Sequence, residues 1–219
     1  MSFEFMLDTL NPKKRFTVLG ISLLLSAGLA HASAIEQFKA FVLNAKTAKG
    51  EFNQVQMKMV NGVSKVGKSS SGTFKFARPG KFIWTYLKPY EQILQADGDK
   101  LYLYDRDLNQ VTIKNLGNAI ASSPAAILFG SVDLEKNFTM RDVEVKQGIE
   151  WLEAVPKTKD SQFDSIGIGM KDGIPVGMEL RDSFGQISVI TLKNFEKNSS
   201  FPLDQFKFVV PAGADVLRP

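Results

Sequence analysis

The sequence contains no cysteine, and it has only one histidine, His31, among its 219 residues. Without thiols the chain has no disulfide framework, no cysteine nucleophile and no thiolate zinc site. A single imidazole also argues against catalytic arrangements and metal clusters that need several histidines. The residues on which most nucleophilic and metal-dependent chemistry relies are therefore missing.

A strong excess of charge of either sign is missing as well. The 27 Lys and Arg residues are scattered among 23 Asp and Glu residues, which leaves a formal net charge of +4. Proteins that bind nucleic acids concentrate their basic residues on one face, so we expect no nucleic-acid partner. The proportions of 44% apolar and 23% charged residues are typical of a soluble globular domain.

Familiar catalytic motifs are also absent from the sequence. There is no G-x-S-x-G, no glycine-rich phosphate loop and no nucleophile beside an evident base. The stretch from Asp105 to Asn109 resembles the start of a calcium loop, but Gln110 and Leu116 stand where such a loop needs Gly and Glu. We therefore expect no metal, no other cofactor and no enzyme activity. A pair of carboxylates brought together from distant strands, as in glycosidases, remains the enzymatic alternative.

Phenylalanine is the residue in excess, with 17 copies. From Glu51 onward large apolar residues alternate with polar ones, which is the period of a half-buried strand. Asn61-Gly62, Asp97-Gly98 and Asp172-Gly173 stand between these runs and are typical of hairpin turns. No long helix separates the strands. The pattern predicts one mainly β, antiparallel barrel or sandwich whose last strand contains Phe206, Phe208 and Val210.

Three segments depart from this alternation. Ile35, Phe38, Val42 and Ala45 predict an amphipathic helix between Ser33 and Lys49, ended by Gly50. Residues 65–72 are rich in Ser, Lys and Gly and are interpreted as a hairpin loop. Ser122-Ser123-Pro124 resembles a helix cap before a short, wholly apolar helix ended by Gly130. That helix either plugs one end of the barrel as core or covers something apolar.

The first residues of the chain have the features of a secretory signal peptide. Three basic residues followed by fourteen uncharged, mostly apolar ones occupy residues 13–29, and Ala30-His31-Ala32 supplies small residues at a cleavage site. The alternative, a membrane anchor, needs about 20 apolar residues. We expect residues 1–32 to be removed, with cleavage after Ala34 as the second choice. The mature domain, 33–219, then has neither His nor Cys.

One block of sequence closely resembles a known family. Residues 78–84 read Arg-Pro-Gly-Lys-Phe-Ile-Trp, and residues 89–105 begin with Pro-Tyr-Glu-Gln-Ile-Leu-Gln-Ala-Asp-Gly-Asp. Both stretches resemble the outer-membrane lipoprotein carrier family, LolA, as do residues 50–54 and 206–216. The resemblance implies a single-domain, mainly β fold. That fold is an unclosed antiparallel β-barrel of about 11 strands, with an N-terminal helix and short lid helices that cover a hydrophobic cavity.

The resemblance also implies a function. Members of this family are periplasmic carriers that bind the acyl chains of outer-membrane-directed lipoproteins. They receive them from an inner-membrane lipoprotein-releasing ABC transporter and deliver them to an outer-membrane lipoprotein receptor. Each buried methylene is worth about 0.8 kcal/mol, so several exposed acyl chains would cost tens of kcal/mol in water. A monomeric carrier without cofactor or catalysis is therefore expected. The alternatives are a secreted β-rich carboxylate-dependent hydrolase and an envelope-stress sensor domain of the same fold.

Finally, the resemblance assigns site residues. The family's Arg, which holds the lid loop in the empty closed state, falls on Arg78, and a guanidinium suits this task because it offers five donors in a rigid fork. Without the resemblance, Arg78 would be interpreted as a surface salt-bridge residue, and for each ring ordinary core packing stays open beside contact with the ligand. The expected acyl-chain cavity and lid residues are Phe74, Phe76, Phe82, Trp84, Tyr86, Ile127, Leu128 and Phe129.

Overall fold

The computed structural model describes residues 32–60, 63–119, 123–130, 134–158 and 161–218. The predicted signal peptide, residues 1–32, lies outside the described residues except for Ala32. All described elements belong to one compact unit, Ala32–Pro219. Among these residues no helix is both long and apolar enough to cross a membrane.

A single sheet of 12 strands dominates this unit, in the order β12-β6-β5-β4-β3-β2-β1-β11-β10-β9-β8-β7. Neighbouring strands are antiparallel, except that β12 runs parallel to β6. The edges β12 and β7 are not paired with each other, so the sheet is unclosed, as predicted. The strands are β1 Thr47–Val60, β2 Val63–Ala77, β3 Lys81–Lys88, β4 Gln92–Asp97, β5 Lys100–Asp105, β6 Gln110–Asn115, β7 Phe138–Lys146, β8 Ile149–Pro156, β9 Phe163–Lys171, β10 Ile174–Asp182, β11 Gln186–Lys197 and β12 Asp215–Leu217.

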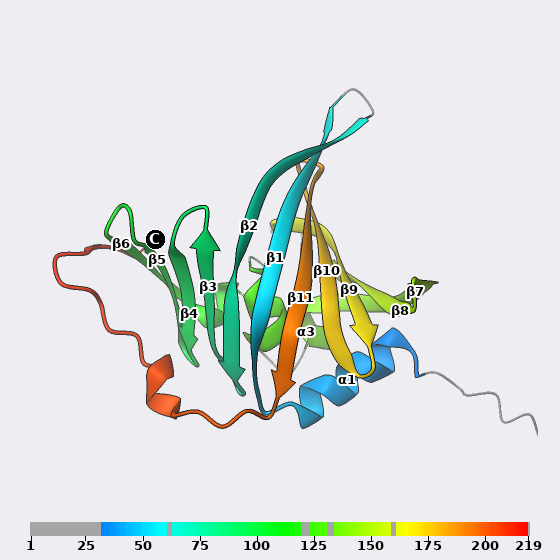
Figure 1. Ribbon diagram of the computed structural model, residues 1–219, viewed down its shortest axis with the longest axis horizontal. Helices are drawn as coiled ribbons and strands as arrows, with labels where there is room; N and C mark the ends of the chain where they lie inside the picture. The colour runs from blue at the N-terminus through cyan, green and yellow to red at the C-terminus, as the bar shows by residue number, and fades with distance from the viewer. Residues whose placement is uncertain (1–31, 61–62, 120–122, 131–133, 159–160, 219) are drawn as a thin grey trace, which may run out of the picture. The chain divides into compact units, whose positions relative to one another are not determined.

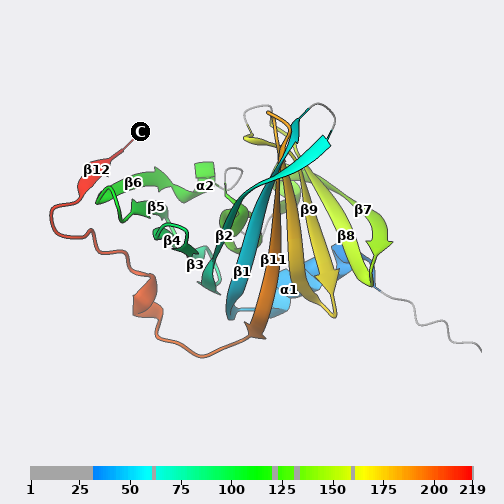
Figure 2. The same ribbon diagram turned by 45° about the horizontal axis from the view of Figure 1, so that its top comes forward.

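Short helices accompany the sheet (Figures 1 and 2). The longest, α1, begins with a capping box in which the Glu36 amide donates to Ser33 Oγ and the Ser33 amide donates to Glu36 Oε2. It packs against β7 to β10, whereas η2 packs against β3. The helices are α1 Ala34–Asn44, α2 Leu116–Ala119, η2 Ala126–Gly130, α3 Leu134–Asn137 and η3 Leu203–Phe206.

The predicted end of the first helix is wrong. The helix stops at Asn44, and Gly50, the predicted terminator, lies inside β1. A Cβ atom at Gly50 would lie 2.5 Å from Cζ of Phe74, so this position has no room for a side chain. Gly50 therefore allows a phenylalanine ring to pack onto the strand backbone. In the sequence, a glycine needed for such close packing looks the same as a glycine that ends a helix.

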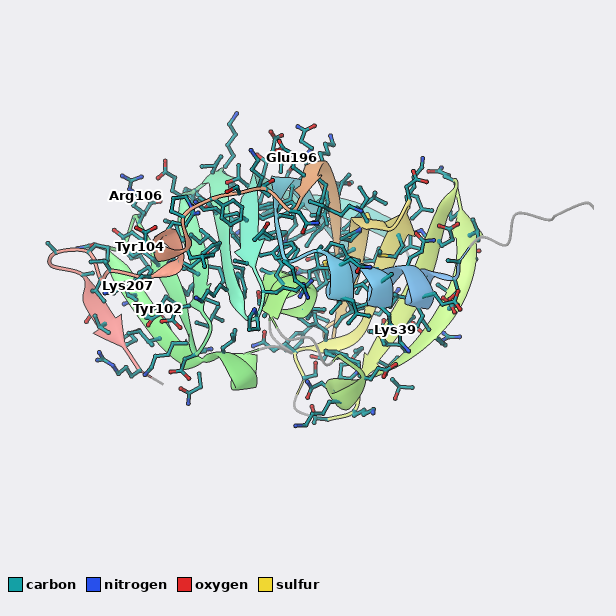
Figure 3. The ribbon with its side chains drawn as sticks, turned by 90° about the horizontal axis from the view of Figure 1, so that it is seen from below. Lys39, Tyr102, Tyr104, Arg106, Glu196 and Lys207 are labelled. Carbon is teal, nitrogen blue, oxygen red and sulfur yellow. The ribbon has the colours of Figure 1, made fainter. Side chains whose placement is uncertain are left out.

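Two further local predictions are wrong. Residues 65–72 belong to the long strand β2 rather than to a loop. The segment Phe206–Val210 is not a strand, because Phe206 ends η3 and the next residues cross the outer face of the sheet. The ring of Phe208 stacks on Tyr102 with 4.5 Å between centroids. Figure 3 shows Tyr102 and Lys207 in this region. The chain then pairs β12 with β6, which gives twelve strands instead of about 11.

Candidate functional site

The inner face of β2 to β5 carries a continuous apolar surface. The strand register places Phe74, Trp84, Leu94 and Leu103 side by side on four neighbouring strands. A second row, Phe76, Phe82, Ala96 and Leu101, runs beside the first. Because side chains alternate between the faces of a strand, residues two apart in sequence build this one surface.

The apolar segment predicted after Ser123 is a short helix that covers this surface. Its cap is the predicted one, since the Ala126 amide donates to Ser123 Oγ at 3.4 Å and the Ile127 amide to the Ser123 carbonyl at 3.1 Å. Every residue from Ala125 to Phe129 is at most 1% exposed. The missing polar face is thereby explained, because the segment is core and at the same time covers the apolar rows of the sheet.

Phe129 inserts its ring among the rings of the sheet. Its centroid lies 4.6 Å from that of Phe76, 5.2 Å from that of Phe74 and 6.3 Å from that of Trp84. Trp84 in turn stacks on Phe52 at 4.0 Å. Such stacked pairs stabilise by about 0.5–1.5 kcal/mol beyond the area they bury. The helix is thus attached to the sheet by aromatic packing.

Arg78 lies between this helix and α1. Its Nη2 donates to the Leu128 carbonyl at 2.9 Å, and its Nε donates to the Ala45 carbonyl at 3.2 Å. The guanidinium also lies 4.9 Å from the ring centroid of Phe76 and 5.4 Å from that of Phe41, which are cation–π distances. Arg78 thus contacts β2, α1 and η2 at once.

The charge of Arg78 has no acidic partner among the described residues. Its Nη1 is buried, and no described residue forms a hydrogen bond with it. Burial lowers the pKa of Arg78 from 12.5 to about 10, so the group stays protonated at neutral pH. The surface salt bridge considered for Arg78 is therefore not observed, and the side chain donates to main-chain carbonyls instead.

The eight predicted cavity and lid residues lie together in one cluster. All are at most 2% exposed except Tyr86, which packs against the cluster from its edge. Burial raises the pKa of Tyr86, and a side-chain interaction with Trp84 partly offsets this effect. Its hydroxyl donates to Oε1 of Gln54 at 3.1 Å. The aromatic rings thus fill the interior themselves in this structure.

A pocket of about 310 Å³ extends from this cluster along the inner face. Trp84 and Tyr86 form one end, and the cap of the covering helix forms another side. Sequence reasoning missed most of the remaining lining residues, although the period-two pattern and their alignment with Trp84 could have identified them. Beyond Trp84, Tyr86 and the cap, the lining residues are Gln92, Leu94, Leu101, Leu103, Thr112, Lys114 and Gln162.

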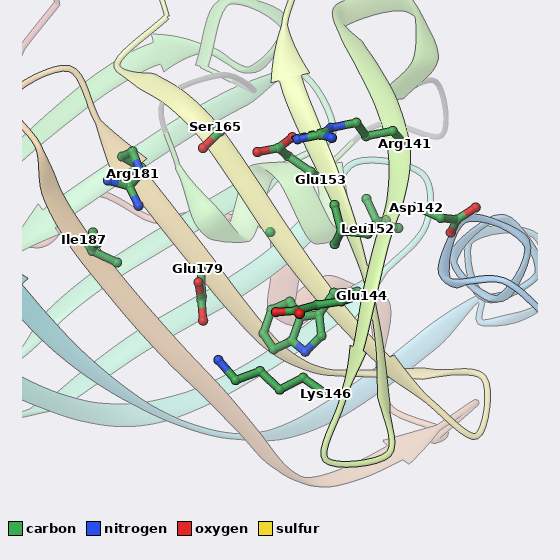
Figure 4. A pocket seen from close by; sticks show the side chains of 13 residues that line it. Arg141, Asp142, Glu144, Lys146, Leu152, Glu153, Ser165, Glu179, Arg181 and Ile187 are labelled. Atoms are coloured by element: carbon green, nitrogen blue, oxygen red, sulfur yellow. Dashed lines mark hydrogen bonds and ion pairs between the residues drawn. The ribbon is translucent and has the colours of Figure 1, made fainter.

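A second pocket, of about 520 Å³, lies on the opposite face of β7 to β11 (Figure 4). Its lining carries both acidic and basic side chains, and Nε of Arg141 donates to Oε2 of Glu153 at 2.6 Å. This mixed charge offers little apolar surface for a lipid. In the described part of the chain no three acidic residues or histidines gather as a metal-binding cluster. The charged residues of the pocket are Arg141, Asp142, Glu144, Lys146, Glu153, Glu179 and Arg181.

Comparison with known proteins gives a consistent result. Residues 43–209 match the family described as outer membrane lipoprotein carrier protein LolA. The outer-membrane lipoprotein carrier protein of Cupriavidus taiwanensis is 55% identical over 86% of this chain and 90% of its own length. That of Ralstonia nicotianae is 53% identical over 88% and 90%. An uncharacterised conserved protein from Thermus thermophilus shares the fold, with a TM-score of 0.53 at 12% identity over 84% of this chain and 96% of its own.

Proposed function

The chain belongs to the LolA family of outer-membrane lipoprotein carrier proteins, and we propose that it holds the acyl chains of its cargo on the apolar rows of the inner face, beneath η2. It is a lipoprotein carrier and not an enzyme. The observation that carries the placement of the acyl chains is the packing of Phe129 among Phe74, Phe76 and Trp84. Acyl chains that displace this ring would enter a surface that is already apolar.

The pocket beside Trp84 and Leu103 is where entry begins in this proposal. It adjoins the aromatic cluster and is bordered by Pro124 and Ala125 at the start of the covering helix. Its volume, about 310 Å³, is at the small end of the range for ligand sites, so several acyl chains need additional space. Outward movement of η2 would supply that space, because the ring of Phe129 occupies the interior next to the pocket.

Arg78 is proposed as the latch of the empty state. One hydrogen bond holds Arg78 to the carbonyl of Ala45, the cap residue of α1, and the other ends on the Leu128 carbonyl of η2, so the second exists only while η2 lies against the sheet. Hydrogen bonds to a charged donor contribute about 1.5–3 kcal/mol each. The latch would therefore favour the closed, empty protein and assist release of the cargo.

The route of the cargo follows from family membership as a proposal. LolA carrier proteins are periplasmic, and we place this chain there as a monomer after removal of residues 1–32. It would accept lipoproteins from an inner-membrane lipoprotein-releasing ABC transporter and pass them to an outer-membrane lipoprotein receptor. N-terminal sequencing of the secreted protein tests the cleavage site.

Native mass spectrometry of the protein purified gently from the periplasm tests the function. A fraction of the carrier should be observed with an acylated polypeptide attached, and Leu103→Asp should reduce that fraction because it places a carboxylate in the apolar pocket. Leu43→Asp is the matched control, since Leu43 is 62% exposed. Repeated absence of any bound lipid from the unaltered protein would count against the proposal.

A further inference from the structure

The inner face of the sheet changes from apolar to polar along the strands. In the half of β1 to β4 that contains Phe52, Phe76 and Phe82, the inward positions carry rings and aliphatic side chains. In the other half, toward Lys88 of β3 and Gln92 of β4, the inward positions carry amides, a hydroxyl and lysines. On β1 the change falls between Phe52 and Gln54, and on β4 it falls between Leu94 and Gln92. Two of these polar residues, Gln54 and Tyr86, hydrogen-bond to each other.

This polar half forms a pocket of about 520 Å³. It shares Tyr86 and Gln92 with the pocket beside the aromatic cluster, so the two are continuous along the inner face. Tyr90 and Leu108, which are 70% and 69% exposed, stand at its outer end. The remaining lining residues are Gln54, Gln56, Lys68, Ser70, Lys88, Pro89, Asp105 and Asp107.

Amide side chains are suited to an extended polypeptide. A glutamine offers both a donor and an acceptor, which are the two groups that an unpaired peptide unit needs. Two lysines and two aspartates line the same pocket, so the charges of its walls balance and no charged ligand is favoured. The mixture of amides with an exposed tyrosine and leucine matches a peptide of ordinary composition better than an acyl chain.

We propose that this polar pocket binds the extended polypeptide that directly follows the lipidated cysteine of the cargo. Gln56 and Gln92 hydrogen-bond to its main chain, while Tyr90 and Leu108 contact its side chains at the exit. The inference rests on the proposed function, because the acyl chains must occupy the adjoining apolar half. The change from apolar to polar side chains between Phe52 and Gln54 then orients the cargo. Its acyl chains lie toward η2, and its polypeptide lies toward the end of the sheet that contains Lys88 and Gln92.

Competitive displacement of a fluorescent acyl probe by two synthetic lipids tests this inference. One lipid is diacylglyceryl-cysteine followed by ten uncharged residues of Ser, Gly, Asn and Thr, and the other is diacylglyceryl-cysteine amide. The unaltered protein should bind the lipopeptide about tenfold more tightly, which corresponds to one or two net hydrogen bonds. The double variant Gln56→Leu/Gln92→Leu should lose that advantage and bind both lipids with equal affinity. Asn53→Leu, on the opposite face of β1, should keep it.

The outcomes separate the two claims. Equal affinity of the unaltered protein for both lipids, or an unchanged preference in the double variant, would overturn the peptide site while leaving the carrier function intact. If the variant keeps its preference but no longer transfers cargo to receptor-containing vesicles, the pocket binds a partner and this proposal is wrong. If neither lipid displaces the probe, the placement of the acyl chains under Proposed function fails instead.

Photo-crosslinking gives a readout that does not depend on affinity. Benzoylphenylalanine introduced at Ser70, in the polar pocket, should form adducts with residues of the bound peptide. The same group at Leu103, in the apolar pocket, should form adducts with the acyl chains. Acyl adducts from both positions would contradict the proposed orientation.

Discussion

Nη2 of Arg78 donates a 2.9 Å hydrogen bond to the main-chain oxygen of Leu128, and this bond links the turn after β2 to the helix that covers the inner face. The same guanidinium holds the Ala45 carbonyl through Nε. A carbonyl acceptor depends on the position of the backbone and not on side-chain identity. The hydrogen bond to Leu128 therefore forms only when η2 lies against the sheet.

Replacement of Arg78 by Leu should slow the release of cargo. Without the donor to Leu128 the closed state is weakened relative to the loaded one, and a loss of about 1.4 kcal/mol already shifts that balance tenfold. We expect lipoprotein-loaded carrier to accumulate and its transfer to receptor-containing vesicles to fall at least about tenfold. Arg78→Lys, which keeps the charge but not the fork of donors, should show part of the defect. Unchanged transfer by Arg78→Leu would remove Arg78 from its proposed role.

Truncation of Phe129 should destabilise the empty protein strongly. The ring is fully buried between Phe74 and Phe76, and Phe→Ala changes in such sites cost about 3–5 kcal/mol. Urea unfolding followed by circular dichroism measures the loss. Phe184→Ala, at a position that is 90% exposed, should change the free energy of unfolding by less than about 0.5 kcal/mol. Similar values for both variants would show that η2 does not pack on the sheet.

A methyl group at Gly72 should be poorly tolerated. An added Cβ would lie 1.8 Å from the Thr85 carbonyl oxygen and 2.8 Å from Cε1 of Phe52, so both β3 and a core ring would have to move. We expect Gly72→Ala to lower the free energy of unfolding by about 3 kcal/mol, the upper end of overpacking costs. Gly117→Ala, with no atom within 4 Å of the added Cβ, should be neutral or stabilise by up to about 1 kcal/mol. Equal stability of both variants would contradict the described packing of β2 on β3.

Tyr102 should make the stability of the fold sensitive to alkali. Burial, together with the hydrogen bond and charge of Asp97, raises the pKa of Tyr102 to about 12, so the folded chain keeps a proton that the unfolded chain loses near pH 10. Its contribution is complete below pH 10 and is lost as the pH rises to 12. Tyr102→Phe keeps a ring against Phe208 but has no proton to lose. The stability difference between the two proteins should therefore shrink over this interval in urea unfolding series, and a constant difference would contradict the Asp97 contact.

The sequence predicted the parts of the fold that depend on side-chain periodicity. Alternating residues such as Phe82 and Trp84 mark a strand with one buried face, and the wholly apolar run at Ile127 marks a helix without a solvent face. Both predictions are confirmed because burial itself imposes these periods. The resemblance, and not the periodicity, pointed to Arg78, since nothing local shows that its guanidinium reaches Leu128.

Features set by contacts between distant segments could not be predicted in this way. Gly50 reads as a helix stop, but its role is to admit the ring of Phe74, which lies on the neighbouring strand. Phe206 and Phe208 alternate like strand residues, yet Phe206 is buried at the end of η3 beside Phe201, and Phe208 stacks on Tyr102. The change from apolar to polar residues beyond Phe52 is visible in the sequence of each strand. The polar residues form a pocket only because the strand register places them side by side.

The two tryptophans allow the most direct test of the placement of the acyl chains. Trp84 lies on the inner face beneath η2, whereas Trp151 lines the charged pocket on the opposite face. A lipopeptide with brominated acyl chains quenches only indoles that it approaches closely, so Trp151→Phe and Trp84→Phe variants report the two faces separately. We predict strong quenching in Trp151→Phe, which keeps Trp84, and none in Trp84→Phe. Quenching of Trp151, or bound lipopeptide that quenches neither residue, would contradict the account.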